Sequence, residues 1–106
     1  MFHLKNKIMQ KRFTAQVPQK ILSAIGWGCP ATYAEVFDYF SEKGMLISIR
    51  RFYDMVSESF GDDYEFVVDC ENTCHSGMCG DANTWIEAAN YAILACLDFM
   101  ETNKTI

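Results

Sequence analysis

Two four-residue segments of the same form, Thr-aromatic-x-Glu, most constrain what this 106-residue chain can fold into. Residues 32–35 are Thr-Tyr-Ala-Glu and residues 84–87 are Thr-Trp-Ile-Glu. In each, the threonine hydroxyl can accept a hydrogen bond from the amide three residues later, and the glutamate can reach back to the threonine amide. This capping box predicts helices that begin at Tyr33 and Trp85. Any sheet must therefore be formed by the residues between these two helices.

Apolar residues at helical spacing follow both segments and give each helix one face to bury. The first helix is predicted from Tyr33 to about Lys43, with Gly44 in the left-handed position that ends it. The second is predicted from Trp85 to about Glu101. Their apolar stripes are Tyr33, Val36, Phe37 and Phe40 in the first helix, and Ile86, Ala89, Ile93, Cys96, Leu97 and Met100 in the second.

Alternating apolar residues between the two helices predict the strands of a sheet. One strand is expected over residues 45–52 and a second over residues 64–70, with residues 53–62 as a polar connection. A short third strand, roughly residues 73–78, can return beside the second after a tight turn at residues 71–72.

The segment before the first capping box is less regular. Residues 12–17 alternate and permit a short strand, and Pro18 precedes a predicted helix over residues 19–25. We therefore expect a basic, partly disordered N-terminal arm over residues 1–17 and a single domain over residues 18–106. The order of elements favours an α+β fold. It would be a two-layer sandwich in which a small antiparallel sheet of two to four strands carries helices on one face.

Charge is unevenly distributed along the chain, and its distribution indicates whether nucleic acid is an expected partner. Residues 1–20 contain five basic residues and no acidic one, whereas residues 21–106 contain four basic and fourteen acidic residues, a net charge of −10. The order of elements resembles that of double-stranded RNA-binding domains, but residues 81–84 lack the lysines that would meet phosphates. Nucleic acid is therefore an unfavoured partner, with only the basic arm and Arg50-Arg51 able to bind it.

The sequence also bears on location. No apolar run reaches the length of a membrane span, and no apolar segment follows the N-terminal lysines as a secretion signal would require. We therefore expect a cytoplasmic protein without a membrane partner.

The densest group of reactive side chains is Cys70, Cys74, His75 and Cys79. Three thiolates and an imidazole could complete a tetrahedral site, so zinc is the one cofactor that the sequence suggests. The spacing departs from the paired ligands of zinc knuckles, and on a strand the adjacent Cys74 and His75 would point to opposite faces. Incidental reduced thiols are the favoured interpretation, and a disulfide such as Cys74–Cys79 is a further alternative.

Catalysis is not expected from this sequence. A cysteine nucleophile would have to use His75, the only histidine outside the N-terminal segment, together with a neighbouring acid to orient it. No nucleophile elbow and no phosphate-binding glycine loop accompanies that group. The acidic pair Asp62-Asp63 is typical of a solvated loop. The chain is therefore not expected to be an enzyme.

The two capping segments and the residues that follow them carry a resemblance. Residues 32–40, Thr-Tyr-Ala-Glu-Val-Phe-Asp-Tyr-Phe, are similar to a T-Y-x-E-V-F-D-W-F motif, and residues 84–93 are similar to T-W-x-E-A-A-x-x-A-I. Both motifs occur in a group of small uncharacterised proteins common in gut bacteria and their mobile elements. The resemblance covers residues 18–101 and departs at Tyr39, where the group has tryptophan. It implies a bacterial or mobile-element origin and the fold, but no activity and no site residue.

Protein interaction is the leading hypothesis that these observations leave. A non-enzymatic accessory or interaction protein would act through its sheet face, a strand edge or the acidic connection at 53–63. Its partner would be another protein or a second copy of the chain. Structural zinc binding through Cys70, Cys74, His75 and Cys79 is the first alternative, and nucleic acid association through the basic arm is the second.

Overall fold

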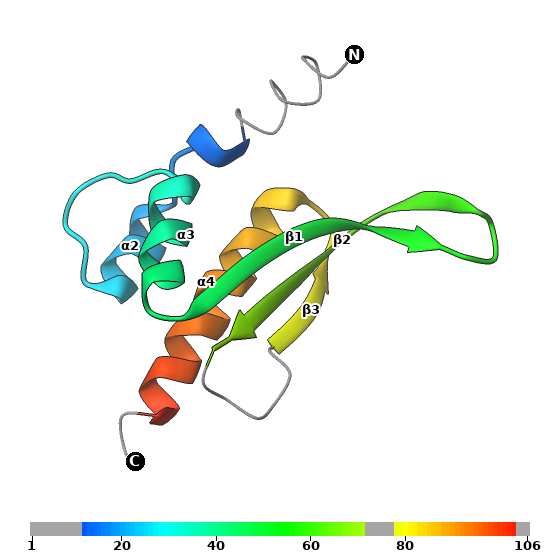
Figure 1. Cartoon of the computed structure of the whole chain (residues 1–106). Coiled ribbons are helices and arrows are strands. Elements are labelled where there is room, and N and C mark those ends of the chain that lie inside the picture. The colour runs from blue at the N-terminus through cyan, green and yellow to red at the C-terminus, as the bar shows by residue number, and fades with distance from the viewer. Residues whose placement is uncertain (1–11, 72–77, 104–106) are drawn as a thin grey trace.

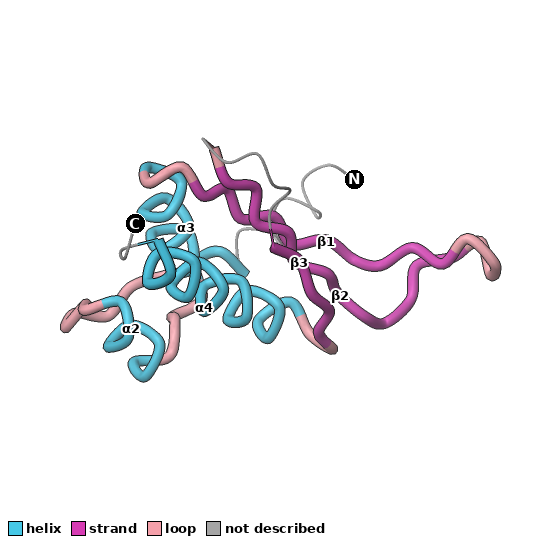
Figure 2. The backbone as a smooth tube through the Cα atoms, turned by 90° about the horizontal axis from the view of Figure 1, so that it is seen from below, coloured by secondary structure: helices cyan, strands magenta, loops and turns pink. Residues whose placement is uncertain are grey.

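A computed structural model describes residues 12–71 and 78–103 of the chain (Figure 1). Its helices are α2 (Gln19–Ile25), α3 (Tyr33–Glu42) and α4 (Trp85–Asn103), and residues 12–14 are also helical. Its strands are β1 (Met45–Asp54), β2 (Ser59–Cys70) and β3 (Met78–Ala82), which form one antiparallel sheet in the order β1-β2-β3. The labelled helices lie on one side of this sheet (Figure 2). The predicted α+β fold, with a small antiparallel sheet and helices on one face, is confirmed.

The capping box that opens α3 forms as the sequence predicts. The amide of Glu35 donates to Thr32 Oγ1 at 3.3 Å, and the amide of Thr32 donates to Glu35 Oε1 at 3.2 Å. At the other end Lys43 caps the helix, and Gly44 has a φ of +85°, a left-handed conformation that favours glycine. Both ends of α3 are therefore fixed by its local sequence.

At the start of α4 the threonine half of the predicted box is present. The amide of Glu87 donates to Thr84 Oγ1 at 3.1 Å, while the Glu87 carboxylate accepts a hydrogen bond from the Tyr91 hydroxyl at 3.0 Å. The buried face of α4 is built mainly from small residues, Ala88, Ala89, Ala92, Ile93 and Cys96. Such a face allows close approach to a sheet, and α4 contacts all three strands.

The sheet buries one face against the helices. Ile47 on β1, Phe66 and Val68 on β2, and Ala82 on β3 are all buried there. Phe66 pairs with Gly80 of β3, and a Cβ added at Gly80 would lie 2.6 Å from Phe66 Cε1. The phenylalanine ring therefore covers a position that only glycine leaves open.

An aromatic cluster joins the first turns of α3 and α4. Phe13 makes edge-to-face contacts with Phe37 and Trp85, whose ring centroids lie 5.9 Å and 5.4 Å away. Tyr33 packs on the same tryptophan at 5.6 Å, and its hydroxyl donates to Asn90 Oδ1 at 2.6 Å. Burial raises the pKa of Tyr33, and the hydrogen bond to Asn90 acts in the opposite direction.

The structure of the N-terminal segment differs in part from its sequence prediction. The strand predicted over residues 12–17 is wrong, because residues 12–14 are helical and only Gln16 forms a β-bridge, with Thr32. Before residue 18, Phe13 lies in the aromatic cluster and Val17 is buried. The helix predicted over residues 19–25 is confirmed as α2.

Two strand predictions also need correction. The polar connection predicted over residues 53–62 is wrong, because β1 continues to Asp54 and β2 begins at Ser59, which leaves a turn of residues 55–58. The third strand predicted over residues 73–78 is displaced to 78–82, and residues 73–77 of that prediction lie outside the described part of the chain.

Candidate functional site

The outer end of the β1–β2 hairpin extends away from the helices (Figures 1 and 2). We call residues 53–63 the hairpin arm. Its ladder is closed by the pairs Tyr53–Phe60 and Asp54–Ser59, beyond an irregularity in register that follows Arg51. A register shift of this kind increases local twist, which turns the arm away from the plane of the rest of the sheet.

The turn at the end of the hairpin arm has a defined local structure. Asp54 Oδ1 accepts a hydrogen bond from the amide of Val56 at 2.9 Å, as in an Asx turn. This bond and a second one from Ser57 hold the pKa of Asp54 below its usual range. Glu58 has a φ of 52°, a left-handed conformation that is uncommon for a residue other than glycine. The turn is thus fixed by side-chain bonding and by one left-handed residue.

Two apolar side chains occupy this turn. Met55 is 79% exposed and Val56 is 94% exposed, the highest values among the large apolar side chains whose exposure the structure describes. Single exposed apolar residues are common on protein surfaces, but these two are adjacent and lie at the end of a projection. Burial of a valine or methionine side chain in a partner would contribute about 1.5–3 kcal/mol. The sequence prediction singled out the 53–63 segment but did not single out these two residues.

The face of the sheet that the described helices leave uncovered is mixed in character. Leu46 on β1 is 55% exposed there. Next along the sheet, Arg50 forms a salt bridge with Glu65, with Arg50 Nε 2.8 Å from Glu65 Oε1, and Asp81 lies opposite Glu65 on β3. Charged groups therefore cross this face, and its described side chains form no continuous apolar surface.

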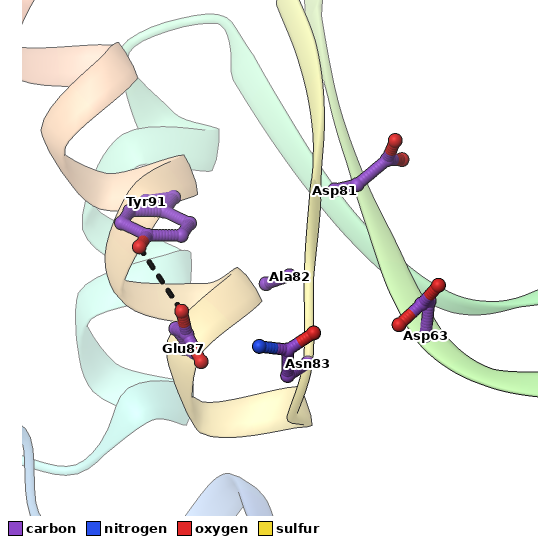
Figure 3. Close-up of a pocket in the computed structure, with 6 residues that line it drawn as sticks. All are labelled: Asp63, Asp81, Ala82, Asn83, Glu87 and Tyr91. Carbon is purple, nitrogen blue, oxygen red and sulfur yellow. Dashed lines mark hydrogen bonds between the residues drawn. The ribbon is translucent and has the colours of Figure 1, made fainter.

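An acidic pocket of about 200 Å³ lies where the base of the hairpin arm meets β3 and the start of α4 (Figure 3). Asp63 and Asp81 line its sheet side, and Glu87 and Tyr91 line its helix side, with Asn83 between them. The Asp81 side chain points away from Glu87 and Tyr91 (Figure 3), so the carboxylates do not converge on one point. Together they still give the rim of the pocket a negative charge, which favours a cationic group such as a lysine or arginine side chain. The sequence prediction missed the contribution of α4, because these residues are far apart along the chain.

The predicted zinc ligands are only partly placed by the structure. Cys70 lies on the helix-covered face of β2 beside the core, whereas Cys79 is exposed and pairs with Val67, which points to the other face. Cys74 and His75 lie outside the described residues. Within residues 12–71 and 78–103, no three His, Cys, Asp or Glu side chains are grouped so as to hold a metal ion. The four-ligand zinc site stays a prediction, and opposite faces disfavour joint ligation by Cys70 and Cys79.

The thiols differ in their surroundings. Cys29 and Cys79 are exposed, and Cys96 is fully buried in α4. Burial raises the pKa of the Cys96 thiol to about 12, with a smaller contribution from Cys70. Burial also raises the pKa of Cys70. Both of these thiols are therefore protonated near neutral pH, which makes them weak nucleophiles.

The basic arm proposed for nucleic acid enters the described structure at Arg12. Its guanidinium lies over the Tyr64 ring, 5.4 Å from the centroid, and Arg12 Nη2 donates to the Tyr64 hydroxyl at 3.1 Å. Lys20 on α2 is exposed. Lys5, Lys7 and Lys11 lie outside the described residues. Arg12 thus serves to hold the N-terminal segment on β2.

In the described part of the chain no helix is both long and apolar enough to cross a membrane. No protein-family model, no curated protein and no solved structure matches the chain.

Proposed function

We propose that this chain is a non-enzymatic protein-interaction domain, an accessory protein of bacterial or mobile-element origin, and that the hairpin arm is its binding element. The observation that carries the proposal is the exposure of Met55 and Val56 at the end of the arm. These side chains contribute almost nothing to the core. They lie in the turn between β1 and β2, and the outer end of this hairpin extends away from the helices (Figure 1).

The local structure of the arm supports the same role. An element that is ordered before binding loses less conformational entropy on binding than a flexible loop does. The Asp54 hydrogen bond and the left-handed Glu58 fix the turn that carries the two apolar side chains. Left-handed residues other than glycine are found preferentially where a function maintains them.

Position-dependent cross-linking in the native host tests the proposal. A photoreactive amino acid is placed at Val56 in the arm, and the matched control places it at Lys20, which is exposed on α2. The arm position should give a discrete adduct with another protein, and the α2 position should not. Equal labelling at both positions, or no adduct at either, would refute binding through the arm.

A further inference from the structure

The hairpin arm combines apolar residues at its end with acidic residues along its length. Residues 53–63 include the acids Asp54, Glu58, Asp62 and Asp63 and contain no basic residue, which gives the arm a net charge of −4. Asp63 at its base also lines the acidic pocket, together with Asp81 and Glu87. Acidic groups therefore extend from the turn of the arm to the first turn of α4.

This charge distribution favours some binding partners of the hairpin arm and disfavours others. Nucleic acids and anionic membranes are repelled by an element of charge −4. A second copy of the chain is also disfavoured, because its open sheet face carries Asp69, Glu65 and Asp81, with Arg50 already paired to Glu65. Docking the arm of one copy on that face would bring like charges together.

We infer that the hairpin arm binds a protein that has an apolar pocket bordered by lysine or arginine residues. The pocket would take Met55 and Val56, and the basic border would face Asp54 and Glu58. A further basic side chain of the partner fits the acidic pocket beside Asp63. This inference rests on the proposed function and adds to it the chemistry of the partner.

The test uses the partner protein that is captured by the cross-linker at Val56. The partner is identified by mass spectrometry and purified without the cross-link. Titration calorimetry then measures the affinity between the partner and the full chain at about 50 mM and about 300 mM salt, concentrations between which screening of exposed charges strengthens. The dissociation constant should rise with salt. The variant Glu58→Gln/Asp63→Asn should weaken binding about two- to fivefold for each charge removed and should reduce the salt dependence.

A second pair of variants separates the apolar contribution. Val56→Ser should weaken binding about tenfold or more, because the valine would be buried in the partner. Leu46→Ser is the matched control: it removes an exposed apolar side chain from the open sheet face and should leave the affinity unchanged. Val56 is 94% exposed, so its replacement should not disturb folding.

The outcomes distinguish the inference from the proposed function. Loss of affinity in Val56→Ser, without any effect of salt or of the charge variant, would keep the arm as the binding element but overturn the basic partner. An adduct with a second copy of the chain, or one released by nuclease, would also overturn the inference. The absence of a position-dependent adduct would refute the proposed function itself.

Discussion

Gly80→Ala should destabilise the fold when residue 66 is phenylalanine, but not when residue 66 is replaced by leucine. The added Cβ would lie 2.6 Å from Phe66 Cε1 and 2.9 Å from Cζ, which is closer than carbon atoms can approach. Phe66 is only 7% exposed and is held among core residues, so its ring cannot simply swing away. Overpacking of this kind costs about 1–3 kcal/mol, whereas replacing glycine by alanine in a strand contributes about 0.5–1 kcal/mol. The steric cost is larger, and a net destabilisation of about 1–2 kcal/mol is expected.

The Phe66→Leu background removes the ring atoms that cause this clash. There Gly80→Ala should be neutral or stabilising by up to about 0.5–1 kcal/mol, because only the change in backbone entropy remains. Urea unfolding of the four proteins, followed by circular dichroism and tryptophan fluorescence, gives the coupling energy directly. Equal destabilisation by Gly80→Ala in both backgrounds would refute the packing of Phe66 over Gly80.

Four further outcomes are expected. The fold raises the pKa of the Cys96 thiol from 9.0 to about 12, so ionisation of this thiol favours the unfolded state. The free energy of unfolding should therefore fall as pH rises from 9.0 toward 12, and it should fall less steeply in Cys96→Ala. Tyr33→Phe should cost about 1 kcal/mol in urea unfolding through the lost bond to Asn90, and no loss would contradict that bond. Light scattering after size exclusion should find a monomer, and a stable dimer would contradict the charge argument. Elemental analysis should find less than about one tenth of an equivalent of zinc, and a full equivalent would support the four-ligand site instead.

The helices were predictable because their signals are local. Thr32 and Thr84 cap α3 and α4 at the predicted residues, and Gly44 ends α3 in the left-handed conformation. The apolar spacing that follows Thr32 places the buried face of α3. In α4 the predicted stripe is correct at Ala89, Ile93 and Cys96 and wrong at Ile86, which is 38% exposed. These features depend on residues three or four positions apart, so no knowledge of the sheet is needed to find them.

The hairpin arm could not be predicted in the same way. No helix of the described residues packs against its strands (Figures 1 and 2). Apolar alternation is therefore not required there, and the sequence pattern is that of a polar loop. Gly61 looks like a loop boundary in the sequence but lies within β2, while the left-handed turn position is filled by Glu58. The two adjacent apolar residues Met55-Val56 within an acidic segment were the one signal of the arm.

The third strand and the acidic pocket depend on contacts between distant residues. β3 contains Gly80, whose space is filled by Phe66 from β2, so its own residues show little apolar pattern. The pocket joins Asp63 to Glu87 through the pairing of β2 with β3 and the short link to α4. Sequence spacing alone gives no sign that these carboxylates line the same pocket.

The order of α4 after the three strands has a consequence for how the protein is made. This helix covers the buried face of all three strands and contacts α2 and α3, yet it is synthesised after them. Until α4 leaves the ribosome, β2 and β3 lack the helix that contacts them, and Phe66 and Val68 are left partly uncovered. Folding must therefore be completed late, and nascent chains that stop before residue 85 should aggregate rather than form a smaller stable domain.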